Sequence, residues 1–228
     1  MIEQLAFRDG QAGFSWRHTR GVLVDLLAEH GHALRPDENG KGFLIHDDVG
    51  ELLVKFTPPL VQRIREPHID PTGYLEHLPD SLGTHLVLLL QAGAAALGIF
   101  RQGELTHHKV IKKYVVRGRG RAQPTHLKTR GKSRYGSRLR LQNHKRLLAE
   151  TNEKLRAWTD EVPQIHDRFY SCPVRTWPEL FDTRPGPPFP PEDFVKIPLD
   201  LSVPTLKELQ RAYRGVCRGV LLQPGKNT

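Results

Sequence analysis

Apolar positions in the first third of the chain follow a helical period and then an alternating one. They recur at helical spacing between residues 16 and 30, which predicts an amphipathic helix. The segments 42–46 and 51–56, with a turn between them, predict a β-hairpin. Five prolines between residues 57 and 83 predict an irregular connector. We therefore expect an N-terminal helix-plus-hairpin subdomain over residues 1–80.

The central third predicts strands followed by a long helix. Residues 86–91 and 94–100 predict two strands, and the first is nearly all branched aliphatic, which is typical of a strand that is covered on both faces. A turn leads to a third strand over residues 104–116. Apolar residues between 137 and 158 then recur at helical spacing. The expected buried stripe of this helix comprises Leu141, Leu148, Leu155 and Trp158.

Together these elements predict an α/β (α+β) fold, with a mixed central β-sheet and helices on both faces. We expect the N-terminal helix and the long helix to form the two covering layers. Ten of the 18 prolines lie between residues 163 and 204 and predict irregular chain. Thr205-Leu-Lys-Glu208 is typical of a capping box and predicts a last helix, and residues 220–222 predict an edge strand. The second domain is therefore expected over residues 81–228.

The basic charge of the chain is concentrated in one segment. The whole chain has 34 Lys and Arg against 25 Asp and Glu, a formal charge of +9. Fourteen of these basic residues, and no acidic residue, lie between residues 105 and 149. A solvated helix face usually mixes both signs, so an acid-free stretch of this length is typical of proteins that bind a polyanion. The charge distribution predicts a nucleic-acid partner, with RNA favoured.

Several other classes of protein are disfavoured. The longest apolar run, over residues 86–100, is too short to span a bilayer, and no secretory signal is visible. The two cysteines form no disulfide framework, and the histidines have no Cys or carboxylate at ligand spacing. Phosphate-loop, dinucleotide and Ser-His-Asp patterns are not found. We expect a cytoplasmic, monomeric protein without a metal site, a small-molecule cofactor or a membrane partner.

A long flexible basic loop is expected over residues 117–136, between the third strand and the long helix. Structureless loops of this length are uncommon in compact domains unless they are functional or disordered. Arg134, Arg138 and Arg140 crowd the N-terminal end of the helix, where each misplaced cation costs about 0.3–1 kcal/mol against the macrodipole. A bound phosphate backbone would neutralise both the side chains and the helix end.

The sequence Gly120-Arg-Ala-Gln123 lies in this loop. A glycine three residues before a glutamine is a weak motif alone, but ordered motifs surround it. With these, the segment resembles the release-factor-like domain of the Vms type, which acts in ribosome-associated quality control and is related to the catalytic domain of eukaryotic and archaeal peptide-chain release factors. Release factors have two glycines directly before the glutamine, where this chain has Arg121 and Ala122. The other matching motifs are His108-Lys109, Tyr114-Val-Val-Arg117, Gly136-Ser137, Leu139-Arg140, Asn143, Ile197-Pro-Leu199 and Pro204-Thr-Leu-Lys-Glu-Leu-Gln210.

The resemblance covers roughly the last 140 residues and implies a ribosome-dependent peptidyl-tRNA hydrolase. Its partners would be the large ribosomal subunit with its rRNA and peptidyl-tRNA, and its loop would enter the peptidyl-transferase centre. Gln123 is the implied catalytic residue, with Gly120 allowing close backbone approach. The Gln123 amide can orient water and donate to a developing oxyanion. Because a neutral amide is no general base, proton transfer would fall to water or RNA, and we expect the isolated protein to be nearly inert.

Two other functions are open at this point. Members of this branch are also described as cleaving the tRNA itself to remove its 3′ CCA end, and Lys113, Tyr114 and Arg117 are candidate catalytic residues for that nuclease. The third alternative is a non-catalytic ribosome-binding or RNA-binding module. Under all three, the cations expected to contact RNA are Lys109, Lys112, Arg119, Arg121, Lys128, Arg130, Lys132, Arg134, Arg138 and Arg140.

Overall fold

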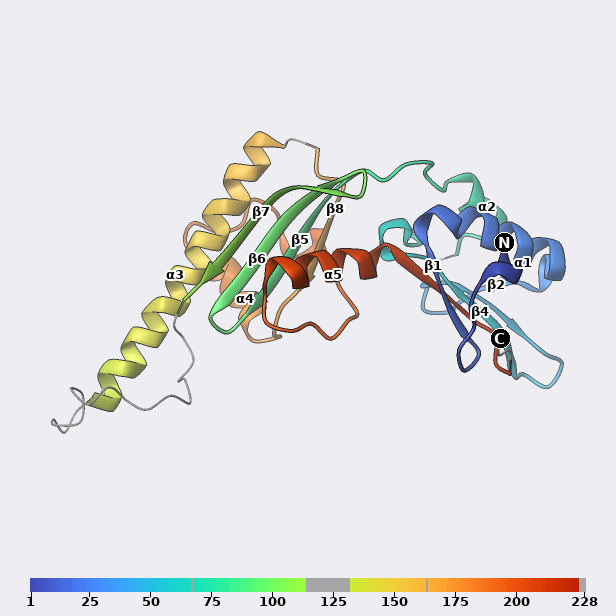
Figure 1. Ribbon diagram of the computed structural model, residues 1–228, viewed down its shortest axis with the longest axis horizontal. Helices are drawn as coiled ribbons and strands as arrows, with labels where there is room; N and C mark the ends of the chain where they lie inside the picture. Colours follow the sequence, from blue (N-terminus) through green and yellow to red (C-terminus); the bar gives the residue numbers. More distant parts are fainter. Residues whose placement is uncertain (67, 114–131, 163, 226–228) are drawn as a thin grey trace. The chain divides into compact units, whose positions relative to one another are not determined.

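The protein consists of two compact units (Figure 1). This computed structural model describes residues 1–66, 68–113, 132–162 and 164–225. Unit 1 comprises Met1–Leu82 and Tyr213–Thr228, and unit 2 comprises Gly83–Ala212. The sequence places a single boundary between residues 80 and 81, whereas the structure divides the chain a second time near its C-terminus.

Unit 1 is an antiparallel sheet with two helices. Its strand order is β1-β10-β4-β3-β2. The stacked rings of Phe14, Phe43 and Phe56 lie in its core. The predicted helix and hairpin are confirmed as α1 and as the β3–β4 pair. The bounds are β1 Gln11–Ser15, α1 Thr19–His30, β2 Arg35–Pro36, β3 Phe43–His46, β4 Leu52–Thr57, α2 Pro71–Glu76 and β10 Arg218–Leu222.

The C-terminal strand β10 lies inside the sheet of unit 1, and its predicted place at a sheet edge is wrong. It pairs with β1 on one side and with β4 on the other. Leu221 in this strand is fully buried. The apolar pattern of a short strand shows that one face is buried, but it does not identify the strand's neighbours.

Unit 2 contains the mixed sheet that the sequence predicts, in the order β7-β6-β5-β8-β9. The three strands β5, β6 and β7 pair antiparallel, whereas β8 and β9 add to β5 in parallel. The almost continuous burial of β5 and β6 confirms that both faces of this sheet are covered. The bounds are β5 Thr84–Gln91, β6 Ala94–Arg101, β7 Glu104–Lys112, β8 Asp167–Ser171 and β9 Phe194–Lys196.

Helices cover both faces of the unit 2 sheet, but one of them is not the helix that we expected. On one face, α3 (Lys132–Glu161) and α4 (Thr176–Asp182) pack against the inward side chains of β5 and β6. On the other face, α5 (Leu206–Val216) lies so close that a Cβ on Gly98 would meet Leu209 Cδ2 at 2.7 Å (Figure 1). The expected layer from α1 is wrong, because α1 belongs to the core of unit 1.

The long helix begins earlier than its apolar pattern indicates. It starts at Lys132 rather than at residue 137, so residues 132–136 of the expected loop 117–136 are helical. These residues are mostly polar or glycine, so the spacing of apolar residues cannot indicate that the helix starts there. Leu148, Leu155 and Trp158 are buried as predicted.

The predicted capping box of α5 is half formed. The Glu208 N–H donates to Thr205 Oγ1 at 3.1 Å. The Glu208 carboxylate instead accepts from the Ser202 N–H and from two nitrogens of Arg211. The Arg211 hydrogen bond, followed by the Ser202 hydrogen bond, lowers the pKa of Glu208 below its usual 4.5. This carboxylate, 7% exposed, therefore ties the segment before α5 to the helix.

We expect Glu208→Gln to lower the free energy of unfolding by about 1–3 kcal/mol at pH 7, because it weakens charge-assisted hydrogen bonds in a buried setting. The folded-state pKa of Glu208 is depressed, so its contribution is fully present above pH 4.5 and is lost as the pH falls through that pKa. Urea unfolding of both proteins at pH 7 and pH 3 measures the effect. The exposed Glu153→Gln on α3 is the matched control. An equal difference at both pH values would contradict the assignment.

Candidate nucleic-acid interface

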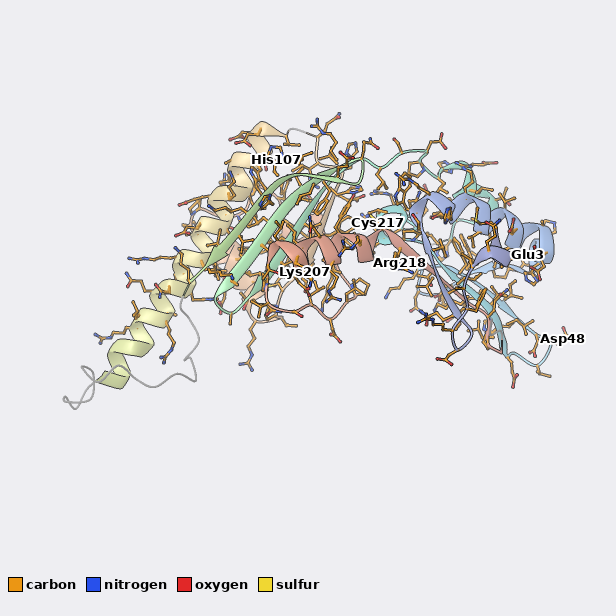
Figure 2. The ribbon with its side chains drawn as sticks, viewed as in Figure 1. Glu3, Asp48, His107, Lys207, Cys217 and Arg218 are labelled. Atoms are coloured by element: carbon orange, nitrogen blue, oxygen red, sulfur yellow. The ribbon has the colours of Figure 1, made fainter. Side chains whose placement is uncertain are left out.

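The N-terminal half of α3 forms an arm that extends beyond the hydrophobic core of unit 2 (Figure 1). The first buried side chain that the structure describes on α3 is Leu147, and those from 138 to 146 are exposed or half-buried. Leu141, which we expected on the buried stripe, is 58% exposed. At 1.5 Å per residue, residues 132–146 span about 22 Å. We call this segment the α3 arm, and Figure 2 shows its described side chains extending away from the rest of the unit.

Strand β7 lies at the edge of the sheet and carries cations beside α3. Lys109 and Lys112 on this strand are exposed, while Ile111 between them packs into the core with α3. The strand ends at Lys112 and α3 begins at Lys132. The chain therefore leaves the described part of unit 2 from β7 and returns to it at the start of the α3 arm.

The structure places only some of the predicted site residues. Of the expected RNA contacts, Lys109, Lys112 and Arg138 are exposed and Arg140 is half-buried. Lys132 and Arg134 belong to α3, but their side chains are not among those described. The site residues that lie outside the described residues are Tyr114, Arg117, Arg119, Gly120, Arg121, Gln123, Lys128 and Arg130.

Lys113 is already engaged by an acidic residue of α3. Its Nζ lies 2.6 Å from Glu150 Oε1, and the two side chains are 27% and 43% exposed. Its backbone N–H donates to the Gly93 carbonyl at 2.8 Å. The sequence does not identify Glu150 as the partner of Lys113, because no local pattern connects two residues that lie so far apart in the chain.

A groove of about 860 Å³ lies between α3 and α4. His144 Nε2 and Glu179 Oε2, which both line it, are 2.6 Å apart. The walls also carry the cations Lys145, Arg146 and Arg184 together with the carboxylate of Asp182. The two carboxylates among these cations make the groove less selective for anions than the α3 arm, which has no acidic residue between 132 and 146.

Other chemistries find little support in the described parts of the chain. Burial raises the pKa of Cys172 to about 12 and that of Cys217 to about 11, so both thiols are protonated at neutral pH and are poor nucleophiles. No three His, Cys, Asp or Glu side chains among the described residues are arranged to hold a metal ion. None of the helices described is long and apolar enough to cross a membrane.

No curated protein matches the chain. Among solved structures it is similar to the "Vms1 mitochondrial localization core", at 10% identity and a TM-score of 0.48 over 89% of this chain and 83% of that one. It is also similar to the "Crystal structure of archaeal translation termination factor, aRF1", at 14% identity and a TM-score of 0.38 over 92% of this chain and 65% of that one.

A family described as "bVLRF1: Bacteroidetes VLRF1 release factor" matches residues 85–222. Apart from the first residue of β5, this range includes all five strands of the unit 2 sheet and the three helices that cover it. It also confirms the resemblance to release factors that the motifs around Gln123 indicate. Because the match spans more than half of the sequence, the chain belongs to the bVLRF1 family of release factors.

Proposed function

We propose that this protein frees stalled nascent chains by hydrolysing the ester of peptidyl-tRNA on the large ribosomal subunit, with Gln123 as the catalytic residue. The observation that carries the proposal is the α3 arm, which extends beyond the core and carries cations in a chain of the release-factor family. The Gly120–Gln123 motif lies in the segment between β7 and this arm.

The shape of the substrate explains why such an arm is useful. The ester joins a peptide to the 3′ ribose of a tRNA and is held at the end of a funnel walled by RNA. A protein that reaches it needs a narrow extension, and the α3 arm supplies about 22 Å of single helix. Positive side chains along that extension replace the counterions of the RNA phosphates and so favour entry. Arg138, Arg140, Lys109 and Lys112 supply this charge on the described residues.

The chemistry assigned to Gln123 needs the ribosome. Its side-chain amide orients the attacking water, and its N–H groups donate to the oxyanion as negative charge develops. The side chain cannot accept the proton from water as a base. Proton transfer therefore falls to RNA groups or to water, and the active site is a composite of protein and ribosome.

Product analysis tests this proposal. Purified protein is incubated with stalled complexes of large subunit and peptidyl-tRNA, and the peptide and the tRNA are resolved separately. We expect free peptide and a tRNA with an intact CCA end. A tRNA shortened at its 3′ end would identify the nuclease instead. Normal ribosome binding without either product would identify a binding module.

A further inference from the structure

Two polar contacts lie at the base of the α3 arm, where the helix leaves the core. One joins Lys113 Nζ to Glu150 Oε1, and the other joins His144 Nε2 to Glu179 Oε2, each at 2.6 Å. Leu147, the first buried residue described on α3, lies between them in sequence. We call them the brace contacts, because each connects the base of the arm to another element of unit 2.

The brace contacts hold α3 from different sides. A helix turns by about 100° per residue, so side chains six positions apart, as at 144 and 150, point about 120° apart around the axis. Glu150 faces the residue that follows β7, whereas His144 faces Glu179 on α4. Hydrophobic packing of the neighbouring turn is non-directional. Two directional contacts on separate sides therefore add a constraint on where the arm points.

The Lys113 contact also sets the point at which the chain leaves the sheet. The Lys113 N–H donates to the Gly93 carbonyl at 2.8 Å and so continues the pairing of β7 with β6 by one residue. Its ammonium binds the helix to which the chain returns after residue 131. Strand end and helix are thereby fixed to each other just before the segment that carries Gln123.

We propose that Glu150 and Glu179 are positioning residues, which hold the α3 arm and Lys113 in the orientation that brings Gln123 to the ester. The inference rests on the proposed release function. It also gives Lys113 a role different from that of a catalytic cation, because its charge acts through Glu150. No base in the reaction is assigned to either glutamate.

If Glu150 and Glu179 act as positioning residues, their substitution lowers the catalytic rate but barely changes the stability of the fold. Both pairs are partly solvent-exposed, and exposed ion pairs contribute little to global stability. A displacement of about 1 Å at a reacting centre, by contrast, can lower a rate by about 100-fold. Variants of the brace contacts should therefore remain folded, with a melting temperature within about 2 °C of wild type, and lose catalytic rate.

The first test uses kinetics on stalled complexes. We expect Glu150→Gln and Glu179→Gln each to lower kcat about tenfold and to leave KM for the complex within about twofold. Glu153→Gln, which removes the same charge from an exposed position on the same helix, should behave as wild type. The exchanged pair Lys113→Glu with Glu150→Lys should recover most of the rate that Lys113→Glu alone loses. A wild-type kcat in Glu150→Gln, or no recovery in the exchanged pair, would overturn the proposal.

The second test needs no release activity. Hydrogen exchange of the Lys113 amide reports the hydrogen bond to Gly93 directly, and we expect it to become at least about threefold faster in Glu150→Gln. An unchanged exchange rate of the Lys113 amide would overturn the proposed role of the brace contacts, whatever the release assay shows. If the wild type releases no peptide but the Lys113 amide still exchanges faster in Glu150→Gln, the proposed function is refuted and the role of the brace contacts is supported.

Discussion

Replacing Gln123 by alanine is expected to lower nascent-chain release by about 100-fold to 1,000-fold, the loss typical when one oxyanion donor is removed from an active site. The same variant should bind the large subunit as tightly as wild type, since the substitution removes no charge. Single-turnover peptide release from stalled complexes measures the first quantity, and co-sedimentation measures the second.

Gln210→Ala is the matched control for this variant. Gln210 is exposed on α5, on the face of the sheet opposite α3, and it makes no side-chain hydrogen bond in the described part of the chain. Its substitution should change neither release nor binding. If Gln123→Ala released peptide at the wild-type rate, Gln123 would have no part in the mechanism. RNA binding by its positive charge would then be the remaining explanation for the composition of the segment.

Removing the Arg138 and Arg140 charges together is expected to weaken large-subunit binding by about 100-fold at 0.1 M salt. Each phosphate contact contributes about 0.9 to the slope of log affinity against log salt, so Arg138→Gln with Arg140→Gln should lower that slope by about 2. A titration of binding at several salt concentrations measures both effects.

The control for this double variant removes the same charge elsewhere in the chain. Lys207 and Arg214 are exposed on α5 and belong to neither β7 nor the α3 arm; Figure 2 labels Lys207. Lys207→Gln with Arg214→Gln should leave the salt slope unchanged. Equal losses in both double variants would show that net charge, rather than the cations of the α3 arm, carries the binding.

The fold could be predicted where a local pattern decides it. The branched aliphatic run of β5 indicated a sheet covered on both faces, and β5 and β6 are both buried almost throughout. The identity of the second covering helix could not be predicted this way, because α1 and α5 both have an apolar face. Which helix covers this face depends on the contact of Leu209 with Gly98, and these two residues lie 111 positions apart in the sequence.

The candidate site could likewise be predicted only where a local pattern decides it. Charge clustering identified β7 and α3 as the cationic elements, and the structure places Lys109, Lys112 and Arg138 exposed on them. The engagement of Lys113 by Glu150 could not be predicted, because it joins a strand end to a residue five turns into a helix. Gln123 lies outside the described residues, so its catalytic role stays a prediction.

The central claim is that one amide side chain becomes catalytic only inside the ribosome. It is tested most directly by measuring ester hydrolysis by wild type and Gln123→Ala on two substrates, free peptidyl-tRNA and the stalled large-subunit complex. We predict rapid hydrolysis only for wild type acting on the complex. Measurable hydrolysis of free peptidyl-tRNA that Gln123→Ala leaves unchanged would contradict the account.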